Sequence, residues 1–401
     1  MSPQRPPIDY AVLPRRWGRP PWTVEFKPPR RSVPKEVEIA IIGGGFTGLA
    51  TAAWLGHLAP QKSVALFEAG RVGMGASGRT GGMVLAETAA GDLPGLGDVF
   101  SGFSGTLEAL QVECDFYAHG AWEIGRSGGL RKSPIRWNDS GKLRVVSKIP
   151  GGTVDAGRLL SGLGAAAHRS GTLLFEDHPV EKVDWGAGVE LATATARVRA
   201  AQVLFATNAL GLEASGLAAF ARPCFTLAVA TEPLTPETLK STGLEELKPF
   251  YTADLPYLWG RVIRRSNASV WGGGLVHVES WRELGEIDVH KGEAARLLDS
   301  LESRIRRLHP ALERVRITHR WGGPILFSPD WRPIFHRHPA SDKGLVLGAY
   351  AGHGVALSVH LGRWAAEALL GRRELPHWPA TGRKSNRWIP DLHFRAHGPS
   401  K

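Results

Sequence analysis

Three glycines at fixed spacing are the residues of this chain best suited to organise a chemical site. Gly43, Gly45 and Gly48 form a G-x-G-x-x-G pattern directly after the apolar run 37–42, and an Ala/Leu-rich segment follows them. The pattern predicts a strand, a tight turn and a helix whose N-terminus receives the phosphates of a dinucleotide. Glu68 ends the next apolar run about 20 residues further on, where a carboxylate binds a ribose 2′-hydroxyl.

Two other interpretations compete for the same stretch. Residues 39–61 contain no charged side chain, so hydropathy alone would allow a membrane span. A strand, turn and helix that bind no ligand are the second alternative. The three consecutive glycines, with a helical pattern that starts only after them, argue against the span and favour the dinucleotide site.

The positive charge of the chain lies in its two tails. The 401 residues carry a formal net charge of +11. Residues 1–35 hold six Arg and two Lys against Asp9 and Glu25, residues 372–401 hold seven basic against two acidic residues, and the body between them is formally neutral. This distribution argues against a nucleic-acid groove. The Pro-rich first tail is expected to be extended and poorly packed, solvated or lying over its own domain, with docking to an anionic membrane surface as the alternative.

Cysteine, histidine and nucleophile patterns exclude several classes of protein. Cys114 and Cys224 are the two cysteines, so a disulfide framework is excluded and a reducing compartment is expected. His336 and His338 alternate but lack a third ligand nearby, and no metal is expected. The chain shows no G-x-S-x-G elbow and no P-loop lysine. The N-terminus lacks the apolar segment of a secretion signal, so the cytoplasm is the expected location.

Several other segments of the chain are expected to surround the dinucleotide site and to set its position. A second Gly-rich stretch covers 70–84, and a third forms a turn at 351–354 that opens a helix ending before Gly371. The segment 202–209 predicts a buried strand that ends in small polar residues, the position where open α/β sheets place ligands. Residues 225–278 read as an antiparallel sheet, 291–310 as a charged amphipathic helix, and helical signals extend over 107–125.

These segments together resemble the D-amino-acid oxidase family of FAD-dependent oxidoreductases, in the branch with glycine oxidase, sarcosine oxidase and gamma-glutamylputrescine oxidase. The resemblance is carried by IIGGGFTGLATAAWLG, VALFEAGRVGMGASGRTGGM, VLFATNA and GAYAGHGVALSVHLGRWAAEAL. It implies an α/β chain (α+β overall), with a Rossmann-like FAD-binding domain interleaved with an antiparallel-sheet substrate domain. The expected division is an arm at 1–35, an FAD-binding domain at 36–90, 151–215 and 326–371, a substrate domain at 91–150 and 216–325, and a tail at 372–401.

The resemblance also implies which residues contact FAD. The pyrophosphate would contact Gly43, Gly45, Phe46, Thr47 and Gly48. The adenosine end would contact Glu68, Ala69, Arg71, Val180, Ala206, Thr207 and Asn208. The ribityl chain and flavin ring fall to Ala76, Ser77, Arg79, Gly81, Gly82 and Met83, and the flavin pyrimidine edge to Gly352, His353, Gly354, Val355 and Ala356. The alternative for each is a purely structural role in a turn; Arg79, for example, either faces the flavin or fixes the loop.

Noncovalent FAD is expected. Some relatives attach FAD through a Cys or a His, and this chain has Trp321 and Thr80 at the matching places. Attachment through His353 is the alternative. The flavin would accept a hydride from an amine or amino acid, giving an imine that hydrolyses.

The candidate pocket and catalytic residues are Tyr257, Trp259, Arg261, Trp321 and His353. Residues 257, 259 and 261 alternate along one strand and share a face. Arg261 would bind a substrate carboxylate or form a surface or interdomain salt bridge. A dry aromatic pocket would favour the neutral amine that oxidation requires.

Three other functions stay open from the sequence. The first is a membrane-docked dehydrogenase that passes electrons to quinone, and the second is a non-catalytic flavin-binding subunit. The third, an NAD-only dehydrogenase, leaves the second and third Gly-rich segments unexplained. The expected partners are a small amine or amino acid and oxygen or another electron acceptor, without nucleic acid; substrate identity and oligomeric state are left open.

Overall fold

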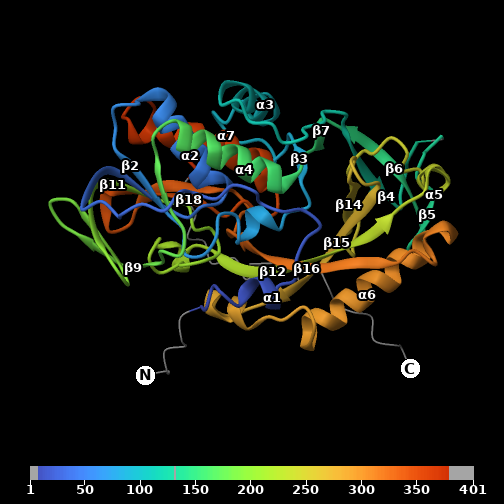
Figure 1. Ribbon diagram of the computed structural model, residues 1–401. Helices are drawn as coiled ribbons and strands as arrows, with labels where there is room; N and C mark the ends of the chain where they lie inside the picture. Colours follow the sequence, from blue (N-terminus) through green and yellow to red (C-terminus); the bar gives the residue numbers. More distant parts are fainter. Residues whose placement is uncertain (1–7, 131, 379–401) are drawn as a thin grey trace.

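The computed structural model describes residues 8–130 and 132–378, arranged around two large sheets that lie side by side (Figure 1). The first sheet has the order β17-β18-β11-β1-β2-β8, and β10 and β9 extend it from β11. Its neighbours β18, β11, β1, β2 and β8 run parallel, as a βαβ unit requires. Its strands are β1 (Glu36–Ile42), β2 (Val64–Phe67), β8 (Leu173–Phe175), β9 (Val180–Trp185), β10 (Val189–Thr193), β11 (Arg197–Phe205), β17 (Ile334–His338) and β18 (Ser341–Gly348).

The second sheet has the order β16-β12-β15-β14-β13-β4-β6-β5. All of its pairs are antiparallel except β13 with β4, so the predicted antiparallel sheet is confirmed with one exception. Its strands are β4 (Ala121–Gly125), β5 (Trp137–Asn138), β6 (Lys142–Ile149), β12 (Arg222–Pro233), β13 (Phe250–Thr252), β14 (Trp259–Val262), β15 (Ala268–His277) and β16 (Ile317–Phe327). A separate antiparallel pair is formed by β3 (Met83–Leu85) and β7 (Gly151–Thr153).

The helical signals over 107–125 were wrong beyond Ala109, where helix α3 (Val99–Ala109) ends, and 121–125 form strand β4. Trp122 and Ile124 are fully buried there, and β4 is paired on both sides, by β13 and β6. Pairing of this kind overrides a weak local helix preference, because a strand that is paired on both sides and buries two bulky side chains on one face gains more from packing than from its intrinsic propensity.

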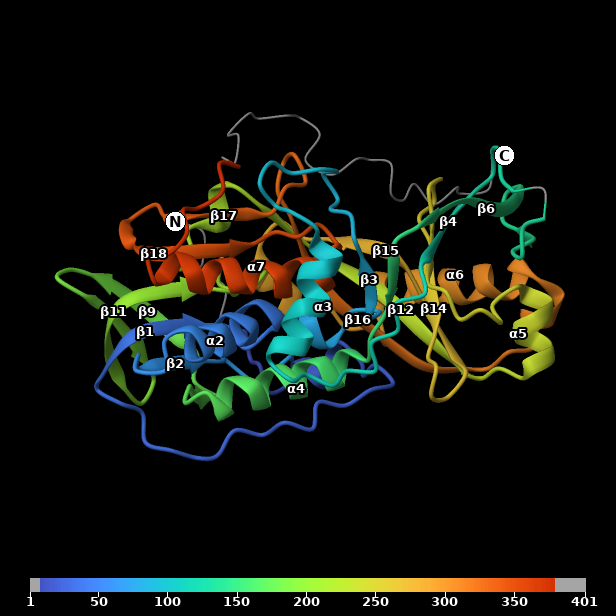
Figure 2. The same cartoon turned by 90° about the horizontal axis from the view of Figure 1, so that it is seen from above.

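Helices cover one face of the first sheet (Figure 1), and Figure 2 separates this half from the half that holds the second sheet. The α-helices are α1 (Leu13–Arg16), α2 (Phe46–Leu58), α3 (Val99–Ala109), α4 (Ala156–Arg169), α5 (Pro236–Thr242), α6 (Gly292–Leu308) and α7 (Gly354–Leu369). The 3-10 helices are η1 (Ala76–Gly78), η2 (Leu217–Ala219), η3 (Trp281–Glu286) and η4 (Pro310–Leu312).

Helix α2 is buried between α4 and α7, which explains the uncharged run at 39–61. Its apolar side chains lie against protein on both flanks, and a Cβ on Gly362 of α7 would come within 2.7 Å of the Ala50 Cβ. Across the described ranges, no helix is both long and apolar enough to cross a membrane.

The arm at 8–35 is extended for most of its length, but it is not poorly packed, which corrects the expectation. Its side chains Ile8, Leu13, Trp17 and Trp22 are buried. Trp17 Nε1 donates to the Leu284 carbonyl at 2.8 Å, and Trp22 Nε1 to the Gly78 carbonyl at 2.8 Å. The proline-rich composition did not predict this packing, because only a few apolar side chains fix the arm to the rest of the protein. Residues 1–7 and 379–401, which carry part of the basic tails, lie outside the described residues.

The arm should contribute measurably to stability through Trp17. Its ring lies 5.3 Å from the Phe225 ring, and its side chain is 0% exposed. We expect Trp17→Ala to lower the free energy of unfolding by about 3 kcal/mol or more, through lost burial and a residual cavity. Urea and thermal unfolding followed by circular dichroism measure this. The exposed Arg19→Ala is the control and should change it by less than about 0.5 kcal/mol; equal effects would show that the arm is not anchored at Trp17.

Candidate cofactor and active site

One cavity of about 650 Å³ opens at the carboxyl edge of the parallel strands, within the size range of small-molecule sites. Strands β1, β2, β11 and β18 all end there, so segments far apart in sequence meet at one edge. Of the residues predicted to bind cofactor or substrate, the cavity wall includes Gly43, Gly45, Phe46, Thr47, Glu68, Ala69, Ala76, Ser77, Arg79, Gly81, Met83, Val180, Ala206, Thr207, Asn208, Tyr257, Trp259, Gly352, His353, Gly354 and Val355.

The first glycine turn leaves the start of α2 facing the cavity. Gly43 has φ of +111°, and a Cβ there would lie 2.6 Å from the Ala206 carbonyl oxygen. A Cβ on Gly48 would lie 2.0 Å from the Gly43 carbonyl oxygen, so the helix packs directly on the turn. Gly45 is the N-cap and supplies no side-chain acceptor. Free N–H groups and the helix dipole make this end a phosphate-binding position.

Glu68 is held against that turn. One carboxylate oxygen accepts the Gly44 N–H at 2.7 Å and the other accepts the Gly70 N–H at 2.9 Å. Burial raises the pKa of Glu68, and the two N–H groups oppose that rise. Arg71, three residues on, points away from the cavity and pairs with Glu176 and Asp177. Arg71 is therefore outside the site that the structure forms.

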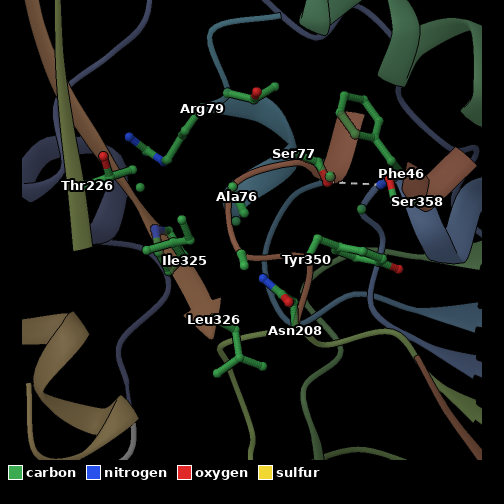
Figure 3. A pocket seen from close by; sticks show the side chains of 18 of the residues that line it. Phe46, Ala76, Ser77, Arg79, Asn208, Thr226, Ile325, Leu326, Tyr350 and Ser358 are labelled. Atoms are coloured by element: carbon green, nitrogen blue, oxygen red, sulfur yellow. Dashed lines mark hydrogen bonds between the residues drawn. The ribbon is translucent and has the colours of Figure 1, made fainter. Parts of the chain in front are cut away.

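The second Gly-rich loop is fixed by Arg79. Its guanidinium donates to the carbonyls of Met74 at 3.0 Å, Gly18 at 2.9 Å and Gly322 at 3.1 Å, and it lies over the Trp17 ring. Burial lowers its pKa to about 10. Of the two sequence alternatives for Arg79, the geometry supports loop fixation, although the side chain also forms part of the wall. Figure 3 shows Arg79 on this wall, with Ser77 accepting the Phe46 N–H at 3.0 Å.

The third segment brings the N-terminus of α7 to the cavity. Gly352 has φ of +89°, and His353 is the N-cap without a side-chain capping bond. Burial lowers the pKa of His353, which favours the neutral imidazole at pH 7. Tyr350 just before it shares a 2.6 Å hydrogen bond with Thr47. This bond joins the α7 turn to the first turn of α2.

Two buried hydroxyls test whether the wall fits a polar ligand. Thr207 Oγ1 and Ser358 Oγ are both buried, both belong to wall residues, and neither has a hydrogen-bond partner among the described residues. An unsatisfied buried hydroxyl costs about 1–3 kcal/mol, so a ligand that supplies partners is favoured. Together with the two helix N-termini and Glu68, these groups fit the phosphates and hydroxyls of FAD.

Two of the predicted catalytic residues lie behind the wall. Arg261 Nε donates to the Gly81 carbonyl, its guanidinium lies 5.7 Å from the Trp22 ring, and burial lowers its pKa to about 10. Trp321 Nε1 donates to the Arg79 carbonyl at 3.0 Å. The structure therefore places neither side chain where it would touch a substrate; both brace the second Gly-rich loop. Gly48, Gly82 and Ala356 also lie outside the wall.

Several wall residues were absent from the sequence prediction. Tyr10, Glu123, Tyr251, Thr226, Ile325 and Tyr350 line the cavity. Most come from the arm or from strands of the second sheet, whose residues carry no motif. Tyr350 had a signal, because it stands beside the predicted turn at 351–354.

No cluster of three or more His, Cys, Asp or Glu side chains suited to a metal occurs in ranges 8–130 and 132–378. Cys114 and Cys224 are buried and free. His338 Nε2 lies 3.1 Å from the Ala214 carbonyl, so it takes part in packing at the end of β17.

Comparison with known proteins decides the family. The sequence model of the FAD dependent oxidoreductase family (DAO) matches residues 38–368. The chain belongs to this family. It is 26% identical over 401 aligned positions to gamma-glutamylputrescine oxidoreductase of Escherichia coli strain K12, covering 87% of this chain and 89% of the relative. It is 25% identical to the probable oxidoreductase OrdL of Rhizobium meliloti strain 1021, covering 84% of each chain.

Solved structures show the same fold. Glycine oxidase from Geobacillus kaustophilus superposes with a TM-score of 0.67 at 18% identity, covering 85% of this chain and 96% of that one. L-proline dehydrogenase from P. horikoshii gives 0.67 at 17% identity, covering 86% and 96%. The predicted family, fold class and FAD cofactor are confirmed, and the NAD-only alternative is wrong. Noncovalent attachment stays a prediction.

The contacts of Glu68 predict its effect on cofactor affinity. We expect Glu68→Gln to raise the Kd for FAD about 10- to 100-fold, because a charged acceptor of two N–H groups is lost beside the ligand. Titration of apoprotein with FAD, followed by flavin fluorescence, measures this. Glu38→Gln is the matched control, since Glu38 lies at the opposite end of β1 and pairs with Lys62. Equal affinities of the two variants would contradict the assignment.

Proposed function

We propose that this FAD-dependent oxidoreductase oxidises the carbon–nitrogen bond of an amine or amino acid. The observation that carries the proposal is a single cavity whose wall joins the cofactor-binding turns to three aromatic side chains, Tyr251, Tyr257 and Trp259. Among the relatives and fold neighbours, the names glycine oxidase, L-proline dehydrogenase and gamma-glutamylputrescine oxidoreductase each point to a nitrogen compound as that protein's substrate.

The aromatic end of the cavity suits a neutral amine. Apolar walls disfavour the ammonium form, and a neutral nitrogen is needed before its carbon can give up a hydride. Bound FAD supplies the hydride acceptor. The substrate loses a hydride and a proton as its C–N bond becomes C=N, and water then adds to this imine and releases a carbonyl compound and the nitrogen as ammonia or an amine.

Two side chains would position the substrate carbon. A Cβ on Gly81 would lie 2.1 Å from the Trp259 ring and one on Gly272 would lie 2.0 Å from it, so both glycines leave room for this indole and fix its place. Tyr257 lies on the same wall. His353, neutral through burial, adds no charge against the amine. We assign Tyr257, Trp259 and His353 to substrate contact, and Arg261 and Trp321 to positioning the loop.

The N-terminus of α7 would stabilise negative charge that develops on the reduced cofactor, because the positive end of its dipole faces the cavity. Electrons would then pass to oxygen or to another acceptor. We place the protein in the cytoplasm. A membrane-docked dehydrogenase remains the alternative, and the parts of the basic tails that bear on it lie outside the described residues.

The visible spectrum of the purified protein tests the proposal. We expect a flavin absorbance that bleaches when an amine or amino acid from a panel is added without oxygen, since the substrate then delivers two electrons to the cofactor. Stopped-flow absorbance gives the rate. Recovery of colour on admitting oxygen would identify an oxidase, and recovery only with a quinone would identify a dehydrogenase. A flavin that no member of the panel bleaches would overturn the proposal.

A further inference from the structure

The charged side chains of the cavity wall differ in whether they have hydrogen-bond partners within the protein. Among described wall residues, the carboxylate and guanidinium groups belong to Glu68, Arg79 and Glu123. Glu68 is bound to backbone N–H groups, and Arg79 to backbone carbonyls. The Glu123 carboxylate forms no hydrogen bond or ion pair with any side chain or backbone group that the structure describes, although its backbone pairs within the sheet. One carboxylate on this wall is therefore left for a ligand.

Sheet register places Glu123 relative to the cofactor end. Trp259 pairs with Tyr251 across β14 and β13, and Tyr251 pairs with Glu123 across β13 and β4. The three side chains form one row on the cavity wall. Neighbouring strands lie about 4.8 Å apart, so Glu123 stands about 10 Å along the row from Trp259, the residue that packs on the Gly81 loop.

A second carboxylate reinforces the negative end of this row. The Tyr251 hydroxyl donates to Glu87 Oε1 at 2.7 Å, and the Tyr251 ring lies 6.4 Å from the Tyr257 ring. Burial and both carboxylates raise the pKa of Tyr251, so it stays a neutral phenol. Aromatic faces beside carboxylates form a favourable environment for an ammonium group.

Within the described residues, neither Glu123 nor Glu87 forms an ion pair with a Lys, Arg or His side chain. Arg261, the residue with the sequence signal for binding a carboxylate, donates behind the loop to the Gly81 carbonyl. A substrate with a carboxylate at this end would lie against Glu123, and the exposed Glu87, hydrogen-bonded to Tyr251, adds a second negative charge nearby. Like charges repel, so this end of the cavity disfavours a carboxylate. The amine on the reacting carbon must be neutral before oxidation, so it gains nothing from a nearby carboxylate. Glu123 and Glu87 would instead stabilise a second, protonated amino group at the far end of the substrate.

We propose that Glu123, supported by Glu87 and Tyr251, binds the distal ammonium of a diamine or polyamine whose other amine is oxidised beside Trp259. This inference rests on the proposed function and names its substrate class. It predicts that the preferred substrate carries two amino groups about two strand spacings apart and no carboxylate at the distal end.

A matched series tests the distal charge on the holoenzyme. The compounds 1,6-diaminohexane, hexylamine and 6-aminohexanoate differ only at the end away from the reacting amine. We expect kcat/KM to fall at least 10-fold from the diamine to hexylamine and further to 6-aminohexanoate, with an optimum chain length among diamines from 1,3-diaminopropane to 1,8-diaminooctane. In Glu123→Gln the diamine advantage over hexylamine should fall to about twofold or less. Glu108→Gln, on the exposed face of α3, should keep it.

Equilibrium binding separates the subsite from turnover. The diamine 2,7-dimethyloctane-2,7-diamine keeps the amine spacing of 1,6-diaminohexane but has no hydrogen on its amine-bearing carbons and cannot be oxidised; 2,7-dimethyloctan-2-amine is its monoamine counterpart. Titration calorimetry of the holoenzyme should show tighter binding of the diamine, and Glu123→Gln should remove that difference. Equal binding of both compounds, or a preference for glycine, sarcosine or 6-aminohexanoate as substrate, would overturn this inference and leave amine or amino-acid oxidation standing. If no compound bleaches the flavin but the diamine still binds through Glu123, the proposed function fails instead.

Discussion

A buried guanidinium holds the two halves of this protein in register at the site. Arg79 sits in the second Gly-rich loop and donates to carbonyls of that loop, of the arm and of β16. In the parts of the chain that the structure describes, no carboxylate contacts the Arg79 guanidinium. Carbonyl dipoles and the Trp17 ring therefore compensate for the water that this charge loses on burial. The position of the loop, and with it one side of the cavity, depends on this arrangement.

Two further donors complete that support. Trp321 donates to the carbonyl of Arg79, and Arg261 to the carbonyl of Gly81, so backbone acceptors of the loop are satisfied from the second sheet. Unsatisfied carbonyls buried at this junction would destabilise the loop. Arg261 and Trp321, which the sequence suggested as catalytic residues, thus hydrogen-bond to the backbone of the loop. The substrate end of the cavity is lined instead by aromatic rings and by Glu123.

The opposite side of the cavity is built from backbone rather than from side chains. Gly43 and Gly48 allow the β1 turn, the strand end at Ala206 and helix α2 to approach more closely than any side chain would permit. Two helix N-termini, those of α2 and α7, then face one space, and the Thr47 to Tyr350 hydrogen bond connects them. Charge stabilisation by helix ends requires this rigidity, since the dipole effect falls off within the first turn.

The sequence by itself predicted a dinucleotide-binding turn, because Gly43, Gly45 and Gly48 stand at short fixed spacing between a strand and a helix. The resemblance carried by four segments of the sequence implied the family and FAD, and the match of the family model to residues 38–368 confirmed both. The tertiary structure alone decided the direction of Arg261, the packing of the arm and the row from Trp259 to Glu123. The row depends on the register between β4 and β13, which lie more than a hundred residues apart in sequence, and a one-residue shift would turn each side chain to the other face. The arm and Arg261 take their places through contacts with distant segments, such as Trp17 with Leu284 and Arg261 with Gly81. Local pattern carries no information about such register, so the substrate end could be recognised only once the sheets were assembled.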